Sequence, residues 1–311
     1  MPSIAPFSLP GKFYRGNIHT HSTLSDGLLT PQQVIQSYKD AGYDFISLTD
    51  HFVSQFEWPI ADTRNLRSET FTTILGAELH APENSVGEIW HILAVGLPLD
   101  FAQAGEHEDG VALARRAMEA GAFVGIAHPL WSQLSIEDGL ALDFAHGVEV
   151  YNHGCAVEND RGDGFYLLDQ LLNKDLNMTA FATDDAHFSS HDNDAFGGWV
   201  HVKSESLDPD SLLTALKAGN YYGSTGPVIN DVRIDGTKLH VECSPVNAII
   251  AQGGLSRSVV QTGQFITSAT LDISLLVEKK KTGWHPVEPS DWFRVTILDD
   301  SRRRAWTNPI W

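Results

Sequence analysis

The chain has 311 residues, of which 42% are hydrophobic and 20% charged, and its formal net charge is −19 at pH 7. This length and composition are typical of a globular protein with one large α/β domain, with or without a small second domain. The acidic balance argues against long nucleic acid as a partner, because binding a polyanion depends on cationic side chains that neutralise its phosphates.

The amino-terminal segment, residues 1–12, contains three prolines and no periodic pattern, so we expect an irregular arm. It lacks the continuous apolar core of a secretion signal, and no apolar run in the chain approaches the ~20 residues that cross a bilayer. The two cysteines, Cys155 and Cys243, are far apart in the sequence, so we do not expect a disulfide between them. Unpaired cysteines are typical of a reducing compartment. We therefore expect a cytoplasmic protein that does not act at a membrane.

Short apolar segments alternate with helix candidates over residues 13–227. The expected strands are residues 14–19, 44–50, 71–78, 90–97, 122–128, 147–152, 178–184 and 197–202. The expected helices are residues 30–42, 110–121, 164–175 and 208–220. Several strand candidates are continuous apolar runs, as in buried parallel strands. The regular alternation predicts a parallel sheet, closed as a barrel.

The pattern changes after Pro227. Residues 228–311 contain alternating stretches such as KLHVEC and FRVTILDD, separated by Gly, Pro and Asn, with no helical period. Such a run predicts short antiparallel strands. We place a domain boundary at residues 226–230 and expect a small all-β domain, a sheet or sandwich, over residues 228–311.

Histidines and carboxylates stand at the ends of successive expected strands. They are His19, His21, Asp26, Asp50, His51, Glu78, His128, Glu149, Asp184, Asp185 and His187. In parallel α/β folds functional groups gather at the carboxyl ends of the strands. His91 is an exception, because it opens its segment and reaches the same edge only if the chain reverses there.

So many polar groups at one buried edge predict a metal cluster. Burying them without partners would cost several kcal/mol each, and a divalent ion offsets that cost. Imidazole suits Zn, Fe and Mn, and carboxylates can join two such ions. The sequence has no G-x-S-x-G elbow, so we do not expect a covalent serine mechanism.

The motifs HTHS, TDH, GAELH…EIWHILAVG, AHP and DAH occur in an order that resembles the PHP (polymerase and histidinol phosphatase) superfamily over residues 13–227. The resemblance implies a distorted (β/α)7 TIM-like barrel that holds two or three divalent ions, commonly Zn, Mn or Fe. It also implies hydrolysis of phosphoesters, and the region behind the barrel looks like the β-rich extension of some members.

The resemblance implies three ligand sets: His19, His21, Glu78 and Asp185; Glu78, His91 and His128; and Asp26, His51 and His187. Of these residues, Glu78, Asp185 and His187 are the expected catalytic groups. Members often place a histidine where this chain has Asp26, so the count of two or three ions depends on that residue. Asp50 and Asp184 are expected to orient ligand imidazoles.

The expected activity is that of a metal-dependent phosphoesterase. It would act through a metal-activated hydroxide on a small phosphorylated metabolite or short nucleotide, with Arg161 and Lys203 as candidate phosphate contacts. Three alternatives stay open: hydrolysis of an amide or lactone, an exonuclease-type phosphodiesterase, and a non-catalytic PHP module. The sequence does not indicate an oligomeric state.

Overall fold

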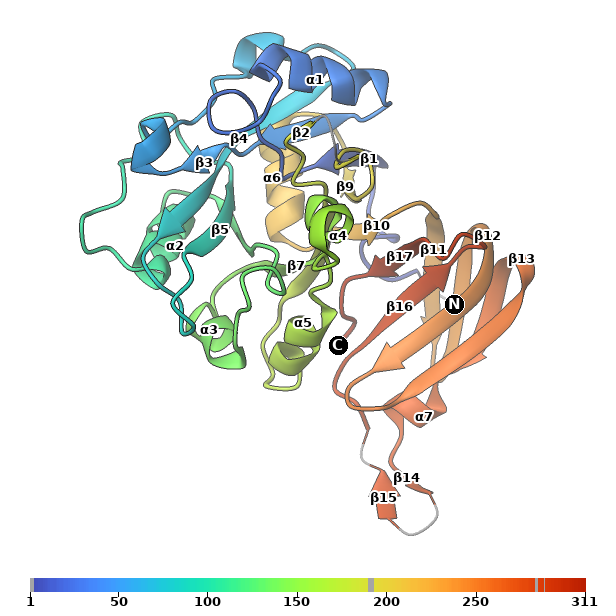
Figure 1. The fold of residues 1–311 in the computed structure, drawn as a ribbon. Helices are drawn as coiled ribbons and strands as arrows, with labels where there is room; N and C mark the ends of the chain where they lie inside the picture. Colours follow the sequence, from blue (N-terminus) through green and yellow to red (C-terminus); the bar gives the residue numbers. More distant parts are fainter. Residues whose placement is uncertain (1–2, 190–192, 283–284, 288) are drawn as a thin grey trace.

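The computed structural model describes residues 3–189, 193–282, 285–287 and 289–311, which form a mixed α/β protein (Figure 1). The strands up to residue 224 are β1 (Lys12–Asn17), β2 (Phe45–Leu48), β3 (His51–Phe52), β4 (Thr72–Ala81), β5 (Trp90–Val95), β6 (Phe123–Ile126), β7 (Gly147–Asn152), β8 (Thr179–Thr183), β9 (Trp199–Ser204) and β10 (Tyr221–Ser224). All eight expected strands are confirmed in position.

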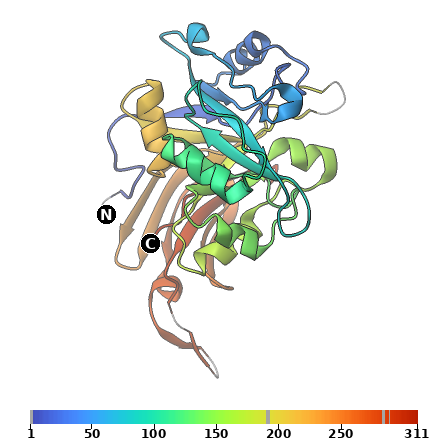
Figure 2. The same cartoon turned by 90° about the vertical axis from the view of Figure 1, so that its left-hand side faces the viewer.

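Helices cover the outside of these strands (Figure 2). They are α1 (Pro31–Asp40), α2 (Gly110–Glu119), α3 (Ile136–Ala141), α4 (His153–Asn159), α5 (Phe165–Leu172) and α6 (Pro209–Lys217), with short 3₁₀ helices η1 (Ser54–Phe56) and η2 (Arg64–Leu66). The four expected helices correspond to α1, α2, α5 and α6. Thr30 caps α1 by accepting from the backbone N–H of Gln33, as its sequence predicts.

The strands up to residue 224 belong to one large sheet and lie in the order β10-β9-β1-β2-β4-β5-β6-β7-β8, with β3 paired to β4. The expectation that residues 13–227 form a wholly parallel sheet is wrong, because β5 pairs antiparallel with β4 and β6, and β9 pairs antiparallel with β1. Parallel neighbours need a long crossover, whereas the short connection over residues 82–89 returns the chain directly.

Backbone contacts beyond the strand ends join β8 back to β1. The N–H of His21 donates to the carbonyl of Ala186, and the N–H of Asp185 donates to the carbonyl of His19, each at 2.9 Å. These contacts bring the two segments together at the end of β1 where His19 and His21 lie. The pairing does not establish seven β/α units, so the (β/α)7 barrel stays a prediction.

The carboxyl-terminal region consists mainly of antiparallel strands. They are β11 (Ile229–Asp235), β12 (Lys238–Gly253), β13 (Ser258–Asp272), β14 (Lys280–Thr282), β15 (His285–Val287), β16 (Phe293–Leu298) and β17 (Arg304–Thr307). A one-turn helix, α7 (Ser274–Val277), differs from the expectation of no helix. Because β10 pairs with both β9 and β17, the sheet is continuous across residue 227, and the division into domains stays a proposal.

None of the described helices is long and apolar enough to cross a membrane.

Candidate metal centre

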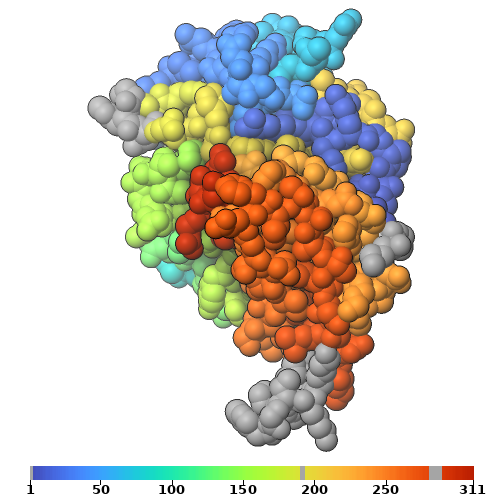
Figure 3. Space-filling model, turned by 90° about the vertical axis from the view of Figure 1, so that its right-hand side faces the viewer, coloured from blue at the N-terminus to red at the C-terminus, as the bar shows by residue number. Residues whose placement is uncertain are grey.

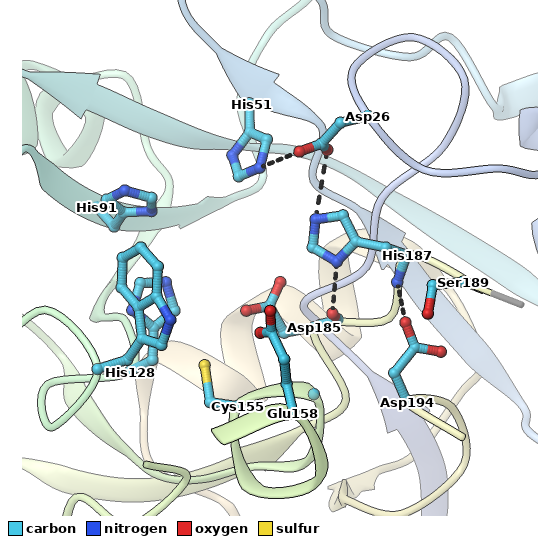
Figure 4. A pocket seen from close by; sticks show the side chains of 12 residues that line it. Asp26, His51, His91, His128, Cys155, Glu158, Asp185, His187, Ser189 and Asp194 are labelled. Atoms are coloured by element: carbon cyan, nitrogen blue, oxygen red, sulfur yellow. Dashed lines mark hydrogen bonds and ion pairs between the residues drawn. The ribbon is translucent and has the colours of Figure 1, made fainter. Parts of the chain in front are cut away.

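The candidate metal centre lies where several strand ends meet (Figure 4). His19 and His21 follow β1, His51 opens β3 and Glu78 lies on β4. Since β4 and β5 are antiparallel, with His80 opposite His91, the start of β5 lies at the edge where β4 ends. The reversal that His91 needs to reach this edge is therefore present.

Glu78 is the centre of the cluster, and it is fully buried. Its Oε1 atom lies 2.9 Å from Nε2 of His128 and 3.0 Å from Nδ1 of His91. Its Oε2 atom lies 2.6 Å from Nδ1 of His51. The Nε2 atom of His19 is 3.4 Å from Oε1. With His21 and His80 at 3.8 and 3.5 Å from Oε2, one carboxylate thus faces six imidazoles and could join two ions.

A second group consists of His19, His21 and Asp185. The Oδ1 atom of Asp185 lies 2.8 Å from Nε2 of His21 and 3.2 Å from Nε2 of His19. These three ligand atoms lie within 4.8 Å of one another, and all three residues are buried. His19 and His21 also lie 3.4 and 3.8 Å from the carboxylate of Glu78, so the four residues expected to hold the first ion lie together.

Asp26 lies between two imidazoles at the mouth of the cluster (Figure 4). Its carboxylate oxygens lie 3.3 Å from Nε2 of His51 and 3.3 Å from Nε2 of His187. His21 completes this group of four possible ligands. The structure therefore brings Asp26, whose side chain is 46% exposed, together with His51 and His187, the residues with which it is expected to hold a third ion.

His80 was not among the ligands expected from the sequence, and it lies on β4 inside the cluster. Its Nε2 atom is 2.8 Å from Nδ1 of His51 and 3.5 Å from Oε2 of Glu78. His51, Glu78, His80 and His91 together form a further possible ligand group. The two-residue spacing from Glu78 was the available signal, because residues i and i+2 of a strand point to the same face.

Glu149 and Asn152 support the ligands from behind. The Nδ1 of His19 donates to Oε1 of Glu149 at 3.0 Å, which turns Nε2 towards Glu78 and Asp185. Asn152 donates from Nδ2 to Glu149 and to Oδ2 of Asp185, each at 3.0 Å. Thr183 also donates to Glu149. These contacts fix the orientation of His19 and Asp185.

Asp50 and Asp184 hold loops rather than ligand imidazoles, so the expectation for them is wrong. Asp50 accepts from the backbone N–H of Ser22 at 2.7 Å and from the hydroxyls of Ser22 and Ser25. Asp184 accepts from the three backbone N–H groups of residues 196–198, each at 2.8 Å. A short carboxylate near a loop finds backbone N–H groups more readily than a distant ring.

The close packing of carboxylates and imidazoles shifts the pKa values of several side chains in the cluster. Burial alone would lower the pKa of His51, but Glu78 and Asp26 outweigh burial and raise it to about 10. Burial and two neighbouring imidazoles lower the pKa of His21 to about 3. Burial would raise the pKa of the Glu78 and Asp185 carboxyls, yet the surrounding imidazoles hold both well below the ordinary range. Both carboxylates are therefore ionised and available to cations.

Three buried atoms of the candidate ligands make no hydrogen bond of suitable geometry among the described residues: Nε2 of His19, Nδ1 of His21 and Oε2 of Glu78, although Oε2 lies 2.6 Å from Nδ1 of His51. Leaving a buried polar atom unpaired costs about 1–3 kcal/mol, so a fold that gathers such atoms at one point favours a cation there. The nitrogen and oxygen donor set suits Zn, Mn or Fe. The residues present thus fit the divalent ions that the resemblance implies.

A cavity of about 350 Å³ opens onto the cluster. Besides ligand candidates it is lined by Trp131, Cys155, Glu158 and Asp194, none of which was expected at the site, and no lysine or arginine lines it among the described residues. The Trp131 ring packs edge-on against His128, with centroids 5.1 Å apart. The cavity wall is therefore aromatic on one side and acidic on the other.

The structure does not bring Arg161 or Lys203 to this cavity. Lys203 pairs with Phe13 at the start of β1, and it lines a different cavity beside α6. The expectation for Lys203 rested on a parallel β9, whereas the antiparallel strand carries its end to the opposite edge from His19. Arg161 follows α4, is exposed and does not line the metal cavity.

The fold is similar to that of a solved protein with a PHP-like domain, so the resemblance is confirmed at the level of the fold. The structure matches a two-domain protein containing a predicted PHP-like metal-dependent phosphoesterase from Bacteroides vulgatus, with a TM-score of 0.51 and 15% sequence identity. The match covers 100% of this chain and 98% of that chain, so both parts of the fold are shared. No protein-family model matches the chain, and no curated protein does.

Two shorter matches cover little more than half of the chain. A candidate metal-dependent phosphoesterase from Bifidobacterium adolescentis has a TM-score of 0.40 at 15% identity, over 55% of this chain and 87% of that chain. An amidohydrolase from Chromobacterium violaceum, with bound sulfate and no metal, has a TM-score of 0.44 at 16% identity, over 57% of this chain and 89% of that chain.

Proposed function

We propose that this protein is a metal-dependent hydrolase that cleaves phosphoester bonds in a small phosphorylated molecule. The observation that carries the proposal is the buried Glu78 carboxylate surrounded by imidazoles, with unpaired ligand atoms directed into one centre. The phosphoesterase named in the Bacteroides vulgatus protein supports the reaction class. The cavity volume of about 350 Å³ supports a small substrate rather than a polymer.

The proposal assigns two or three divalent ions, Zn, Mn or Fe, to the ligand sets named above, with the third depending on Asp26. Ions of this kind supply a water of lowered pKa and polarise the phosphoryl oxygens. Glu78, Asp185 and His187 are the catalytic groups of this proposal. Glu149 and Asn152 keep His19 and Asp185 in the orientations that binding requires.

Cys155 lines the cavity, but it is not assigned as a nucleophile. Burial, together with the nearby carboxylates, raises the pKa of its thiol far above the ordinary range. Thiolate character is what makes a cysteine reactive, so this thiol stays protonated and inert. Both cysteines are unpaired, and the proposal includes a cytoplasmic location on that ground.

A second candidate is hydrolysis of a non-phosphate bond such as an amide or lactone. The observation that favours it is the absence of lysine and arginine from the described cavity lining, since phosphate sites commonly carry such cations. The two candidates differ in the product, which is inorganic phosphate or a phosphate monoester in one case only.

The test combines metal analysis with a substrate panel. Purified protein should contain two or three divalent ions per chain, measured by elemental mass spectrometry, and release phosphate from members of a panel of mononucleotides, bisphosphates and sugar phosphates. His128→Ala should lower metal content and activity together, whereas the exposed His107→Ala should change neither. Metal-loaded protein that cleaves amides or lactones but no phosphoester would refute the main proposal.

A further inference from the structure

A second cavity, of about 390 Å³, lies on the side of α4 that carries His153. Its lining includes Tyr151, His153, Trp199 and three consecutive arginines, Arg302, Arg303 and Arg304, and we call it the arginine cavity. Arg302 and Arg303 lie in the turn between β16 and β17, and Arg304 is the first residue of β17. Figure 3 shows this last part of the chain, in red, against the green segment that contains α4.

The three arginines concentrate positive charge in a chain whose net charge is −19. Arg303 donates through Nε to Asp299 at 2.8 Å, so its terminal N–H groups are left for another acceptor. Arg304 makes a long contact with Asp163, at 3.5 Å, and its guanidinium group lies over the ring of Phe165, 5.4 Å from the centroid. No ion pair is found for Arg302 within the described ranges. Several guanidinium donors thus face one cavity without a full set of partners.

Two glycines make room for the lining. A side chain at Gly197 would overlap the ring of His153. A Cβ atom at Gly226 would lie 2.8 Å from Nε of Arg303. Both side chains therefore lie directly against backbone that has no Cβ atom, which keeps the cavity open from both walls.

The lining of the arginine cavity also includes aromatic side chains whose polar atoms are hydrogen-bonded. The Nε2 of His153 lies 2.9 Å from the carbonyl of Asn193 and therefore donates to it. In the neutral ring Nδ1 is then an acceptor, and the Tyr151 hydroxyl donates to it at 3.0 Å. The two rings are held at an interplanar angle of 30°. With these hydrogen bonds made, Tyr151 and His153 contribute aromatic rings to the lining of the cavity.

We propose that the arginine cavity is a binding site for a small molecule that carries a phosphate group and a planar ring, such as a nucleoside monophosphate. Guanidinium forks match phosphate oxygens in geometry and charge, and a planar ring packs well on aromatic side chains. The site differs from the metal cavity and does not depend on the proposed hydrolase function. The two cavities share a wall, because His153 lines one, and Gly154 and Cys155 line the other.

Arginine labelling tests the site directly. Metal-loaded protein is treated with phenylglyoxal, and labelled residues are identified by peptide mass spectrometry. The ligand is the methylene phosphonate analogue of adenosine monophosphate, which a phosphoesterase cannot hydrolyse. It should slow labelling of Arg302 and Arg303 at least fivefold and leave the exposed Arg64 unchanged. Equal labelling of Arg302 and Arg303 with and without saturating analogue overturns the proposal.

Two further ligands separate phosphate from ring. Inorganic phosphate should protect the same arginines only at higher concentration, and adenosine alone should protect neither. If inorganic phosphate protects as well as the analogue, the ring part of the proposal is wrong. If adenosine alone protects, the guanidinium groups are not the determinants and the phosphate part is wrong.

A double variant provides the second measurement. Arg302→Ala with Arg303→Ala should weaken the binding step at this cavity at least tenfold in calorimetry, with metal content unchanged. Arg64→Ala removes a positive charge elsewhere and should leave that step intact. Arg303→Lys keeps the positive charge but loses the planar guanidinium group. Its affinity for the analogue should lie between those of wild type and the double variant. An unchanged isotherm in the double variant refutes the site, and unchanged thermal unfolding shows that the turn still folds.

Discussion

The single side chain Glu149 illustrates how residues outside the ligand set control a metal site. It accepts from the ring of His19 and from the backbone N–H of His128, so one carboxylate positions two candidate ligands. Glu149→Gln should weaken metal binding about 10–100-fold, as other changes behind metal ligands do. Chelator competition measures this affinity. The exposed Glu119→Gln, which lies outside the metal cavity, is the control, and equal affinities in both variants would contradict the role of Glu149.

His80 lies inside the candidate metal centre, although it was not among the ligands expected from the sequence. Its ring lies 4.2 Å from the ring of His91 and 4.7 Å from that of His51, measured between centroids. If it helps to hold an ion, His80→Ala should speed the loss of one ion to a chelator while the other ions leave at the wild-type rate. His107→Ala is the matched control. Identical release kinetics in His80→Ala and wild type would show that His80 only packs.

At the scale of elements, strand β9 contains a histidine that makes stability depend on pH. Burial, with a smaller effect from Arg15, lowers the pKa of His201 from 6.5 to about 3. Its ring packs on Tyr222, with centroids 4.7 Å apart. The folded state thus favours the neutral ring, whereas the unfolded chain binds a proton as the pH falls below 6.5.

The free energy of unfolding should therefore decline by up to about 1.4 kcal/mol per pH unit below pH 6.5 because of this side chain alone. Above that pH the contribution is fully present. Urea denaturation at a series of pH values measures the slope, and His201→Gln should reduce it. A slope that is the same in His201→Gln and wild type would show that other groups account for all of it.

The positions of the elements followed from the sequence, but their directions did not. Apolar runs bounded by turn residues located β1, β2 and β4 through β9, because local periodicity determines where a strand forms. The direction of β5 and β9 depends on which neighbour each one pairs with, and that is a long-range property. This explains why His91 reached the expected edge by a reversal and why Lys203 lies at the opposite one.

The sequence likewise located part of the candidate site and missed the rest. His19, His21, Glu78 and Asp185 belong to short motifs at strand ends, and the structure brings them together. The contacts of Glu149 and His80 depend on side-chain packing across neighbouring strands, which no local pattern records. Asp50 and Asp184 were misassigned because their partners are backbone N–H groups of loops together with side chains such as Ser22 and Tyr38, and residue spacing does not reveal these contacts.

At the scale of the whole molecule, hydrogen bonds from the carboxyl-terminal segment join the β-rich region to the strands that carry the candidate metal centre. Trp306 is fully buried, and its Nε1 donates to the carbonyl of Ala180 on β8 at 3.2 Å. Two residues later, Oδ1 of Asn308 accepts from the N–H of Ala180 at 2.8 Å. Through these bonds the last residues of the chain support β8, which leads directly to Asp184 and Asp185.

Trp306→Ala should therefore destabilise both regions at once. Emptying a buried tryptophan site costs about 3–5 kcal/mol, and the loss should appear as one cooperative urea transition at lower concentration, because the sheet is continuous through β10 and β17. Circular dichroism follows the urea transition. Hydrogen exchange of peptides from β8 and from β12 measures the protection of each region separately. Trp311→Ala, at a side chain that is 49% exposed, is the control. If β12 loses protection while β8 keeps its wild-type value, the two regions unfold independently and this view of the molecule is wrong.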